Sequence, residues 1–181
     1  MATTTRATIE DLYTVEGKAE LVDGTIVRMS PSGFRPSRAS FRITASLDGH
    51  ERRTGSGFAI GDNVGFRVQL PNRESFSPDA AWFTGQPTGM KFLEGAPVFA
   101  AEVRSEGDYG PAAEVALRQK RADYFAAGAL VVWDVDLLSE DVVRVYRATD
   151  PEQPTLYRRG EVAEAEPAVP GWRMPVDDLF E

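Results

Sequence analysis

The sequence predicts a single α/β (α+β) domain, residues 1–181, built on a mixed β-sheet that is flanked by helices. Three observations predict this fold class. Helix-like and strand-like patterns alternate along the chain, an apolar run at 97–105 has the composition of a central strand, and a delimited helix at 111–127 separates that run from another apolar strand at 129–136. A strand, a helix and a second strand in this order are typical of a βαβ unit.

The N-terminal part of the chain predicts a helix, a hairpin and a second helix. Thr8-Ile-Glu-Asp11 is a capping box, in which the threonine hydroxyl binds a backbone N–H that the first turn leaves unsatisfied. Apolar and polar residues then alternate around Asp23-Gly24, a strong signal for a two-residue hairpin turn. Residues 35–53 follow, with one helical face formed by Ala39, Ile43 and Leu47.

The middle of the chain contains the predicted sheet. The stretch FAIGDNVGFRVQL, residues 58–70, predicts two short strands, and residues 77–84 predict another. Residues 97–105 are almost continuously apolar, which is typical of a strand that is buried on both faces. We therefore expect this strand at the centre of the sheet.

The C-terminal half begins with a well-framed helix. Pro111 suits the first helical position and Gly128 suits the position just after the helix, with Val115, Leu117, Tyr124 and Phe125 as the expected packing residues. Residues 129–136 and 141–147 predict two strands that are joined by a polar turn. The low-complexity stretch EVAEAEPAVP, residues 161–170, is predicted to be a surface loop.

The composition limits the chemistry that the chain can perform. There is no cysteine, and the only histidine, His50, lies in a polar stretch that predicts a surface loop. Disulfides, thiolate sites, Ser-His-Asp triads and multi-histidine metal sites are therefore disfavoured. The net charge of −8 argues against a broad basic face for duplex DNA but leaves room for a local basic cleft. Without an apolar run of the ~20 residues that a membrane span needs, we expect a cytoplasmic protein.

Two acidic residues interrupt apolar, strand-like runs. Asp79 lies in SPDAAWF and Glu102 in PVFAAEV. A lone buried carboxylate would cost several kcal/mol or become protonated. A shared divalent cation removes this cost, because carboxylate oxygens are hard ligands that suit Mg²⁺ or Mn²⁺. The alternative is that both residues lie at strand ends and face water, which is the commoner situation in an acidic protein.

Several short motifs together resemble the Uma2 family of the PD-(D/E)XK, restriction-endonuclease-like nuclease superfamily. They are ELVDG (Glu20–Gly24), SPDAAWF (Ser77–Phe83), AEVRSEGD (Ala101–Asp108), KRADYFAAG (Lys120–Gly128), VVWDVD (Val131–Asp136) and the C-terminal PGWRMPVDDLF. Each motif alone is weak, but their order and spacing are specific. The resemblance covers roughly residues 8–181 and implies a restriction-endonuclease-like sheet core with an N-terminal helix and hairpin.

The resemblance also implies the site. It assigns Mg²⁺ (or Mn²⁺) to Asp79 and Glu102, with Glu20 as a further acid of the metal site. Lys120 takes the place of the superfamily lysine, which in families of this kind has moved to the following helix. A long, flexible ammonium side chain can reach one site from different backbone positions. Four residues are therefore predicted to be catalytic: Glu20, Asp79, Glu102 and Lys120.

Arg104 follows Glu102 by two residues, so alternation along a strand places both side chains on the same face. Three roles remain open for it: a clamp on a substrate phosphate, a replacement for the lysine, or an ion-pair partner that quenches the site. Gln119, next to Lys120, is a second candidate for substrate binding.

The resulting hypothesis is metal-dependent phosphodiester hydrolysis of nucleic acid by an endonuclease that acts on DNA. Because duplex cleavage is simplest for a two-fold dimer with two sites, a homodimer is one expected state. Two alternatives stay open. One is a binding protein that keeps the nuclease fold with little or no turnover, and the other is a hydrolase of a different phosphate ester.

Overall fold

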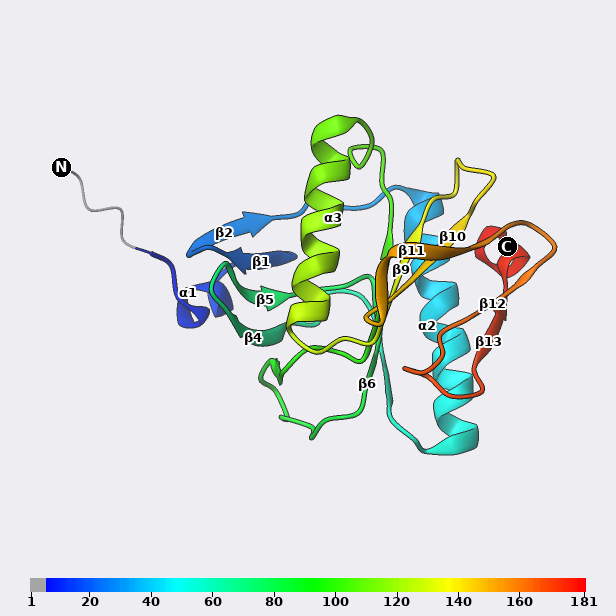
Figure 1. Cartoon of the computed structure of the whole chain (residues 1–181). Coiled ribbons are helices and arrows are strands. Elements are labelled where there is room, and N and C mark those ends of the chain that lie inside the picture. Colours follow the sequence, from blue (N-terminus) through cyan, green and yellow to red (C-terminus); the bar gives the residue numbers. More distant parts are fainter. Residues whose placement is uncertain (1–5) are drawn as a thin grey trace.

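A computed structural model describes residues 6–181, so residues 1–5 of the predicted domain lie outside the described part (Figure 1). Its main sheet has six strands in the order β11-β10-β9-β8-β6-β3. Their bounds are β3 Phe58–Ile60, β6 Ala80–Phe83, β8 Phe99–Val103, β9 Val131–Val135, β10 Val143–Arg147 and β11 Asp150–Tyr157. Strands β8 and β9 are parallel and the other neighbours are antiparallel, so the sheet is mixed as predicted.

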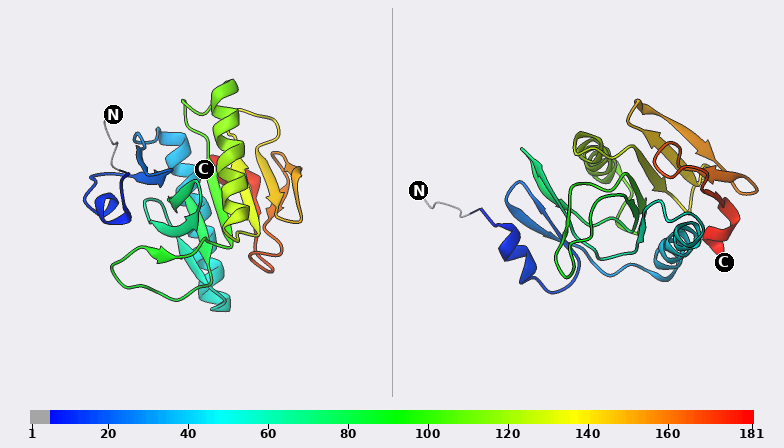
Figure 2. Two further views of the ribbon diagram at one scale, coloured as in Figure 1. Left: turned by 60° about the vertical axis from the view of Figure 1, so that its left-hand side comes forward. Right: turned by 90° about the horizontal axis from the view of Figure 1, so that it is seen from below.

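Strand β8 is central, which confirms the prediction for residues 97–105. Helix α3 (Pro111–Ala126) connects β8 to the parallel β9 and covers one face of the sheet, while α2 (Phe34–Thr54) covers the other (Figures 1 and 2). Alternation along β8 sends Phe99, Ala101 and Val103 into the core beneath α2, and Ala100 into a second core with Tyr124 of α3. Glu102 shares the parity of Ala100, so it faces α3.

Three smaller sheets complete the fold. Strands β1 (Ala19–Val22) and β2 (Thr25–Arg28) form the predicted hairpin, β5 (Arg73–Phe76), β4 (Phe66–Leu70) and β7 (Leu93–Glu94) form a three-stranded sheet, and β12 (Val162–Glu164) pairs with β13 (Arg173–Pro175). The hairpin is fastened to β5, because the backbone N–H of Leu21 donates to Ser75 Oγ at 2.7 Å. The short helices α1 (Ile9–Tyr13) and η1 (Val176–Phe180) lie near the two ends of the chain.

The local signals of the N-terminal region are confirmed. Thr8 and Asp11 make both hydrogen bonds of the capping box at α1. Asp23 and Gly24 both have positive φ, 50° and 66°, as a primed hairpin turn requires. Ala39, Ile43 and Leu47 are fully buried on α2. None of the helices in residues 6–181 combines the length and the apolar composition of a membrane-spanning segment.

Three predictions were wrong. His50 lies on α2, is 4% exposed and packs edge-on against Trp82, because it continues the buried stripe of that helix. Val115, expected to pack, is 65% exposed on the outer side of α3.

The stretch 161–170 is not a surface loop either. It contains β12, and Ala163, Ala165 and Val169 are buried in the main core. The alternation of alanine with glutamate is a period of two, which is a strand pattern with its small residues turned inward.

Candidate active site

Asp79 and Glu102 lie at one end of the main sheet, on neighbouring segments of the chain. Asp79 immediately precedes β6, which pairs antiparallel with β8 through Ala80 and Ala101. The Asp79 backbone N–H donates to Ala101 O at 3.1 Å, and its Oδ2 accepts from the Val103 backbone N–H at 2.8 Å. The register therefore brings the two acids together, one from each strand.

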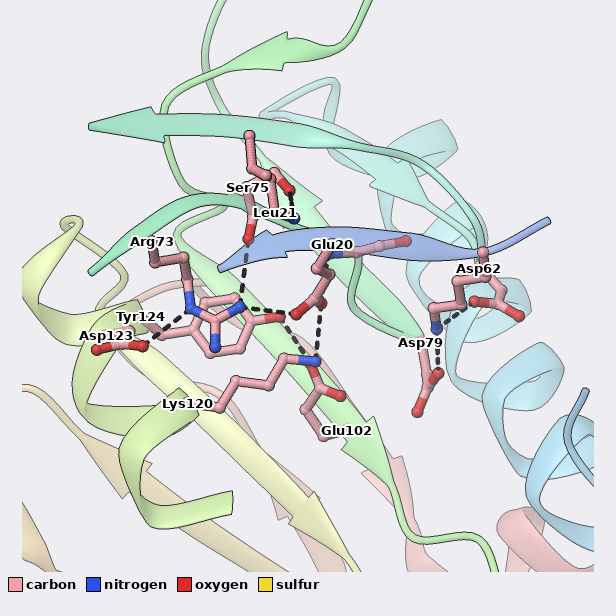
Figure 3. Close-up of polar contacts among 12 residues, drawn as sticks. Glu20, Leu21, Asp62, Arg73, Ser75, Asp79, Glu102, Lys120, Asp123 and Tyr124 are labelled. Carbon is pink, nitrogen blue, oxygen red and sulfur yellow. Dashed lines mark hydrogen bonds and ion pairs between the residues drawn. The ribbon is translucent and has the colours of Figure 1, made fainter. Parts of the chain in front are cut away.

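Glu20 reaches the same place from the hairpin, and Lys120 reaches it from α3 (Figure 3). The Lys120 ammonium lies 2.8 Å from Glu102 Oε1 and 2.9 Å from Glu20 Oε1. Lys120 points from its helix toward the carboxylates, as expected for a lysine that has moved there. Burial would lower its pKa, but the attraction of Glu102 and Glu20 raises it, so the side chain stays positively charged.

A second lysine, Lys18, forms an ion pair with Asp79. Its ammonium lies 2.7 Å from Asp79 Oδ1 and 2.6 Å from Asp62 Oδ1, and its side chain is 16% exposed. Burial would lower its pKa, but Asp79 and Glu102 raise it. Lys18 was missed from the sequence, although it precedes Glu20 by two residues and so shares its face of the extended chain.

Glu20 is the most firmly held of the three acids. It is 3% exposed, and both of its oxygens accept hydrogen bonds: Oε2 from Arg73 at 2.7 Å, and Oε1 from the Ser77 backbone N–H at 2.8 Å. Arg73 is fixed in turn by Asp123, whose Oδ2 accepts from Nε at 2.9 Å. Burial alone would raise the pKa of Glu20, but the charges of Lys120 and Arg73 outweigh it, and the pKa is lowered.

Glu102 has the opposite electrostatic balance. Burial raises its pKa, Lys120 lowers it, and repulsion from Asp79 and Glu20 raises it again, so the net pKa is raised. The Tyr124 hydroxyl donates to Glu102 Oε1 at 2.6 Å, and burial beside that carboxylate raises the tyrosine pKa, which keeps the donor protonated. The pKa values of the two glutamates are therefore shifted in opposite directions, because Glu20 has two cationic partners and Glu102 has acidic neighbours.

Arg104 shares the sheet face of Glu102 but is bound elsewhere. Its guanidinium forms two parallel bonds to Asp134, Nε–Oδ1 at 2.8 Å and Nη2–Oδ2 at 2.7 Å, and it also pairs with Glu114. The side chain is only 5% exposed. Of the three roles that the sequence left open, the geometry of Arg104 fits that of an ion-pair partner. Its partners, Asp134 and Glu114, lie outside the carboxylate cluster.

Gln119 is also held by a neighbour. Its Nε2 donates to Asp123 Oδ1 at 2.9 Å, one turn along α3. Asp123 thus receives bonds from both Gln119 and Arg73, which connects Gln119 to the support of Glu20.

The donor set suits a hard divalent cation. Asp79 and Glu102 present carboxylate oxygens from adjacent strands, and Glu102 Oε2 has no hydrogen-bond donor within residues 6–181. In the same part of the chain, no three acidic or histidine side chains form a ready metal cluster. Lys18 and Lys120 instead neutralise the carboxylates.

Sequence reasoning missed four supporting residues. Arg73 and Asp123 act through contacts between β5 and α3, which no local pattern reveals, and Tyr124 was assigned to packing alone. Tyr124 does pack, with its ring stacked on Phe76 at 4.0 Å between centroids, but its hydroxyl serves Glu102. Lys18 is the fourth residue, and only the two-residue spacing to Glu20 could have indicated it.

Comparison with known proteins points to one family. The model of the Uma2 family, described as "Putative restriction endonuclease", matches residues 7–177. A crystal structure of a protein described as a putative nuclease belonging to DUF820, from Anabaena variabilis, has the same fold. The TM-score is 0.73 at 15% sequence identity, covering 96% of this chain and 97% of that chain. No curated protein matches the chain.

Proposed function

Because the chain belongs to the Uma2 family, described as putative restriction endonucleases, we propose that it hydrolyses phosphodiester bonds of nucleic acid, with DNA as substrate, in a metal-dependent reaction. The observation that carries the proposal is the meeting of Glu20, Glu102 and Lys120 beside Asp79, from four separate elements. A buried cluster of acids and lysines is costly for stability, and such clusters concentrate at functional sites.

In this proposal Asp79 and Glu102 hold a Mg²⁺ or Mn²⁺ ion through their carboxylate oxygens. A bound ion of this kind lowers the pKa of a coordinated water and neutralises charge on the phosphoryl oxygens. Asp79 is oriented by the Val103 backbone N–H and Glu102 by the Tyr124 hydroxyl. Each carboxylate is therefore oriented by a neutral donor and paired with a lysine, Lys18 at Asp79 and Lys120 at Glu102.

Lys120 supplies the positive charge that stabilises negative charge developing on the phosphate. Glu20 positions it, since Glu20 is itself fixed by Arg73 and Ser77 and accepts from the ammonium at 2.9 Å. With both oxygens already bound, Glu20 acts mainly by holding Lys120, and any contact with the metal passes through water.

The second candidate is a nucleic-acid-binding protein with the nuclease fold and no turnover. The observation in its favour is the pairing of Lys18 with Asp79 at 2.7 Å, because a cation must displace this ammonium to bind that carboxylate. The sequence feature that first suggested an inactive site, Arg104, lends less support, because its charge is neutralised by Asp134 and Glu114.

The test is cleavage of supercoiled plasmid, linear duplex, single-stranded DNA and RNA with Mg²⁺, Mn²⁺ or EDTA. We expect cutting of DNA that requires the metal and is abolished in Asp79→Asn and Glu102→Gln. Asp48→Asn, on the exposed side of α2, is the control and should cut normally. Binding without cutting in either metal supports the second candidate, and equal cutting by Asp79→Asn contradicts the proposed site.

A further inference from the structure

The first two turns of α2 expose an unusual set of side chains. We call this set the α2 patch: Phe34, Arg35, Arg38, Phe41 and Arg42. Phe34 is 81% exposed and Phe41 is 57% exposed. Residues seven apart fall on the same side of a helix, so Phe34 lies above Phe41 and Arg35 above Arg42, with Arg38 between them. The buried face of α2, which carries Ile43, is a different side of the helix.

The patch is the centre of a basic segment in an acidic protein. Residues 24–47 contain four arginines and no acidic residue, whereas the whole chain has a net charge of −8. Positive charge is therefore concentrated in this stretch of the sequence. Arginine interleaved with exposed aromatic rings is the composition with which proteins hold nucleic-acid strands.

The helix that carries the patch packs against the candidate active site. Ser40, in the same turn as Phe41, donates from Oγ to the backbone oxygen of Asp79 at 2.7 Å. The N-terminal half of α2 therefore lies against the end of the sheet that carries the acids, and Figure 3 shows the helix behind Asp79. From Phe34 to Arg42 the helix rises about 12 Å, enough for roughly three nucleotides of a strand.

The arginines are oriented and still have free donors. Nε of Arg38 and Nε of Arg42 donate to the backbone oxygen of Glu181 at 2.8 and 3.2 Å. Within residues 6–181 their Nη groups have no hydrogen-bond partner, which leaves a guanidinium edge for phosphate oxygens. The Arg38 guanidinium lies 5.5 Å from the centroid of the Phe41 ring, so the two side chains form one surface.

We propose that the α2 patch binds a single-stranded segment of the nucleic-acid substrate beside the cleavage site. The arginines contact its phosphates, and Phe34 and Phe41 stack on its bases. A single strand is favoured over a duplex because duplex bases are already stacked inside the helix and offer no free face. The inference rests on the proposed function and adds to it the class of substrate.

The test is equilibrium binding of a fluorescent 20-nucleotide single strand, followed by anisotropy in EDTA so that no cleavage occurs. Arg35→Ala/Arg42→Ala should weaken binding at least tenfold and reduce the slope of log K against log salt by about 1.4, because two phosphate contacts are lost. Arg52→Ala/Arg53→Ala removes two exposed arginines from the other end of the same helix and is the matched control, expected to bind like the wild type.

Phe34→Ala/Phe41→Ala tests the stacking separately. We expect about tenfold weaker binding with an unchanged salt slope and little change for a duplex of the same sequence. Circular dichroism and thermal melting verify folding, and substitution of such exposed residues should leave both unchanged.

The outcomes separate this inference from the proposed function. If the wild type cuts or binds nucleic acid but both patch variants bind like the control, the inference alone is wrong. If the wild type binds no nucleic acid, both are wrong. If the phenylalanine variant changes only the oligomeric state in light scattering, the patch is a contact between copies of the chain, and the inference is also overturned.

Discussion

Two glutamates that share one lysine should respond in opposite ways to the same substitution. Glu20→Gln should destabilise the metal-free protein, whereas Glu102→Gln should leave its stability unchanged or increase it. Both side chains are paired with Lys120, at 2.9 and 2.8 Å. The difference lies in the other neighbours: Glu20 has the Arg73 guanidinium at 2.7 Å, whereas Glu102 has the neutral Tyr124 hydroxyl and the repulsion of Asp79 and Glu20.

The magnitudes follow from these contacts. Glu20 is a member of a buried ionic network, and removing one partner from such a network costs about 3–5 kcal/mol. Glutamine keeps the shape and one acceptor, so we expect the lower end, about 3 kcal/mol. For Glu102 the raised pKa means that its ionised form is disfavoured in the folded state, at about 1.4 kcal/mol for each unit. Glutamine removes that penalty, so the variant should unfold at the same urea concentration as the wild type or at a higher one.

The pH dependence has opposite signs at the two positions. The pKa of Glu20 is lowered from its ordinary value of 4.5, so its stabilisation is present above that pH and is lost as the pH falls through the folded pKa. The pKa of Glu102 is raised from 4.5, so the wild type loses stability as the pH rises from 4.5 through the folded pKa. The advantage of Glu102→Gln should therefore be largest at neutral pH and vanish below pH 4.5.

The measurement is urea unfolding in EDTA at pH 7.5 and at successively lower pH values. Glu152→Gln, an exposed glutamate of β11, is the matched control for loss of one negative charge. Equal losses at Glu20 and Glu102 at neutral pH would refute the reasoning, because they would mean that Arg73 and Tyr124 do not distinguish the two sites.

Three further predictions concern the cations around the acids. Lys120→Ala should lower the single-turnover rate of Mg²⁺-dependent cleavage by about 10²-fold, the loss expected for one preorganised charge, and an unchanged rate would exclude it from the reaction. Lys18→Met should strengthen Mg²⁺ binding about tenfold in titration calorimetry, because the ammonium that competes for Asp79 is gone; weaker binding would mean that Lys18 helps to form the site. Arg104→Ala should cost about 3 kcal/mol in urea unfolding, because it leaves the buried Asp134 with only the longer contact to Arg144 at 3.7 Å. Arg104→Ala should not change the slope of log K against log salt for substrate binding. A reduced slope would support the role of Arg104 as a clamp on a substrate phosphate.

The parts of the fold that the sequence predicted are those set by local patterns. Residues 97–103 are apolar except for Glu102, which favours a central strand, and Pro111 with Gly128 marks both ends of α3. The same reasoning would have placed His50 on the buried face of α2, because His50 follows Ile43 and Leu47 at helical spacing. Its polar neighbours in the sequence were given more weight than its periodicity.

The parts that could not be predicted depend on contacts between distant segments. Arg73 lies on β5, whose polar sequence RESF does not indicate that the strand is buried. The partners of Arg73, Glu20 and Asp123, are 53 and 50 residues away in the sequence. The identity of the acids followed from family motifs. The way each acid is neutralised followed only from the register of β1, β5 and α3, which a single sequence does not reveal.

The three acids of the carboxylate cluster are paired with different kinds of cation. Glu20 is paired with Arg73, and the guanidinium of Arg73 is itself held by Asp123. The position of the Glu20 carboxylate is therefore fixed by the surrounding fold. Asp79 and Glu102 are paired with lysines, whose ammonium groups are point charges on flexible stems. In the proposed reaction, a cation that binds Asp79 displaces Lys18, whereas Lys120 stays beside Glu102 because Glu20 holds it. Burial and repulsion from Asp79 and Glu20 raise the pKa of Glu102 against the attraction of Lys120, so Glu102 is the glutamate of the cluster that gains most from an added positive charge.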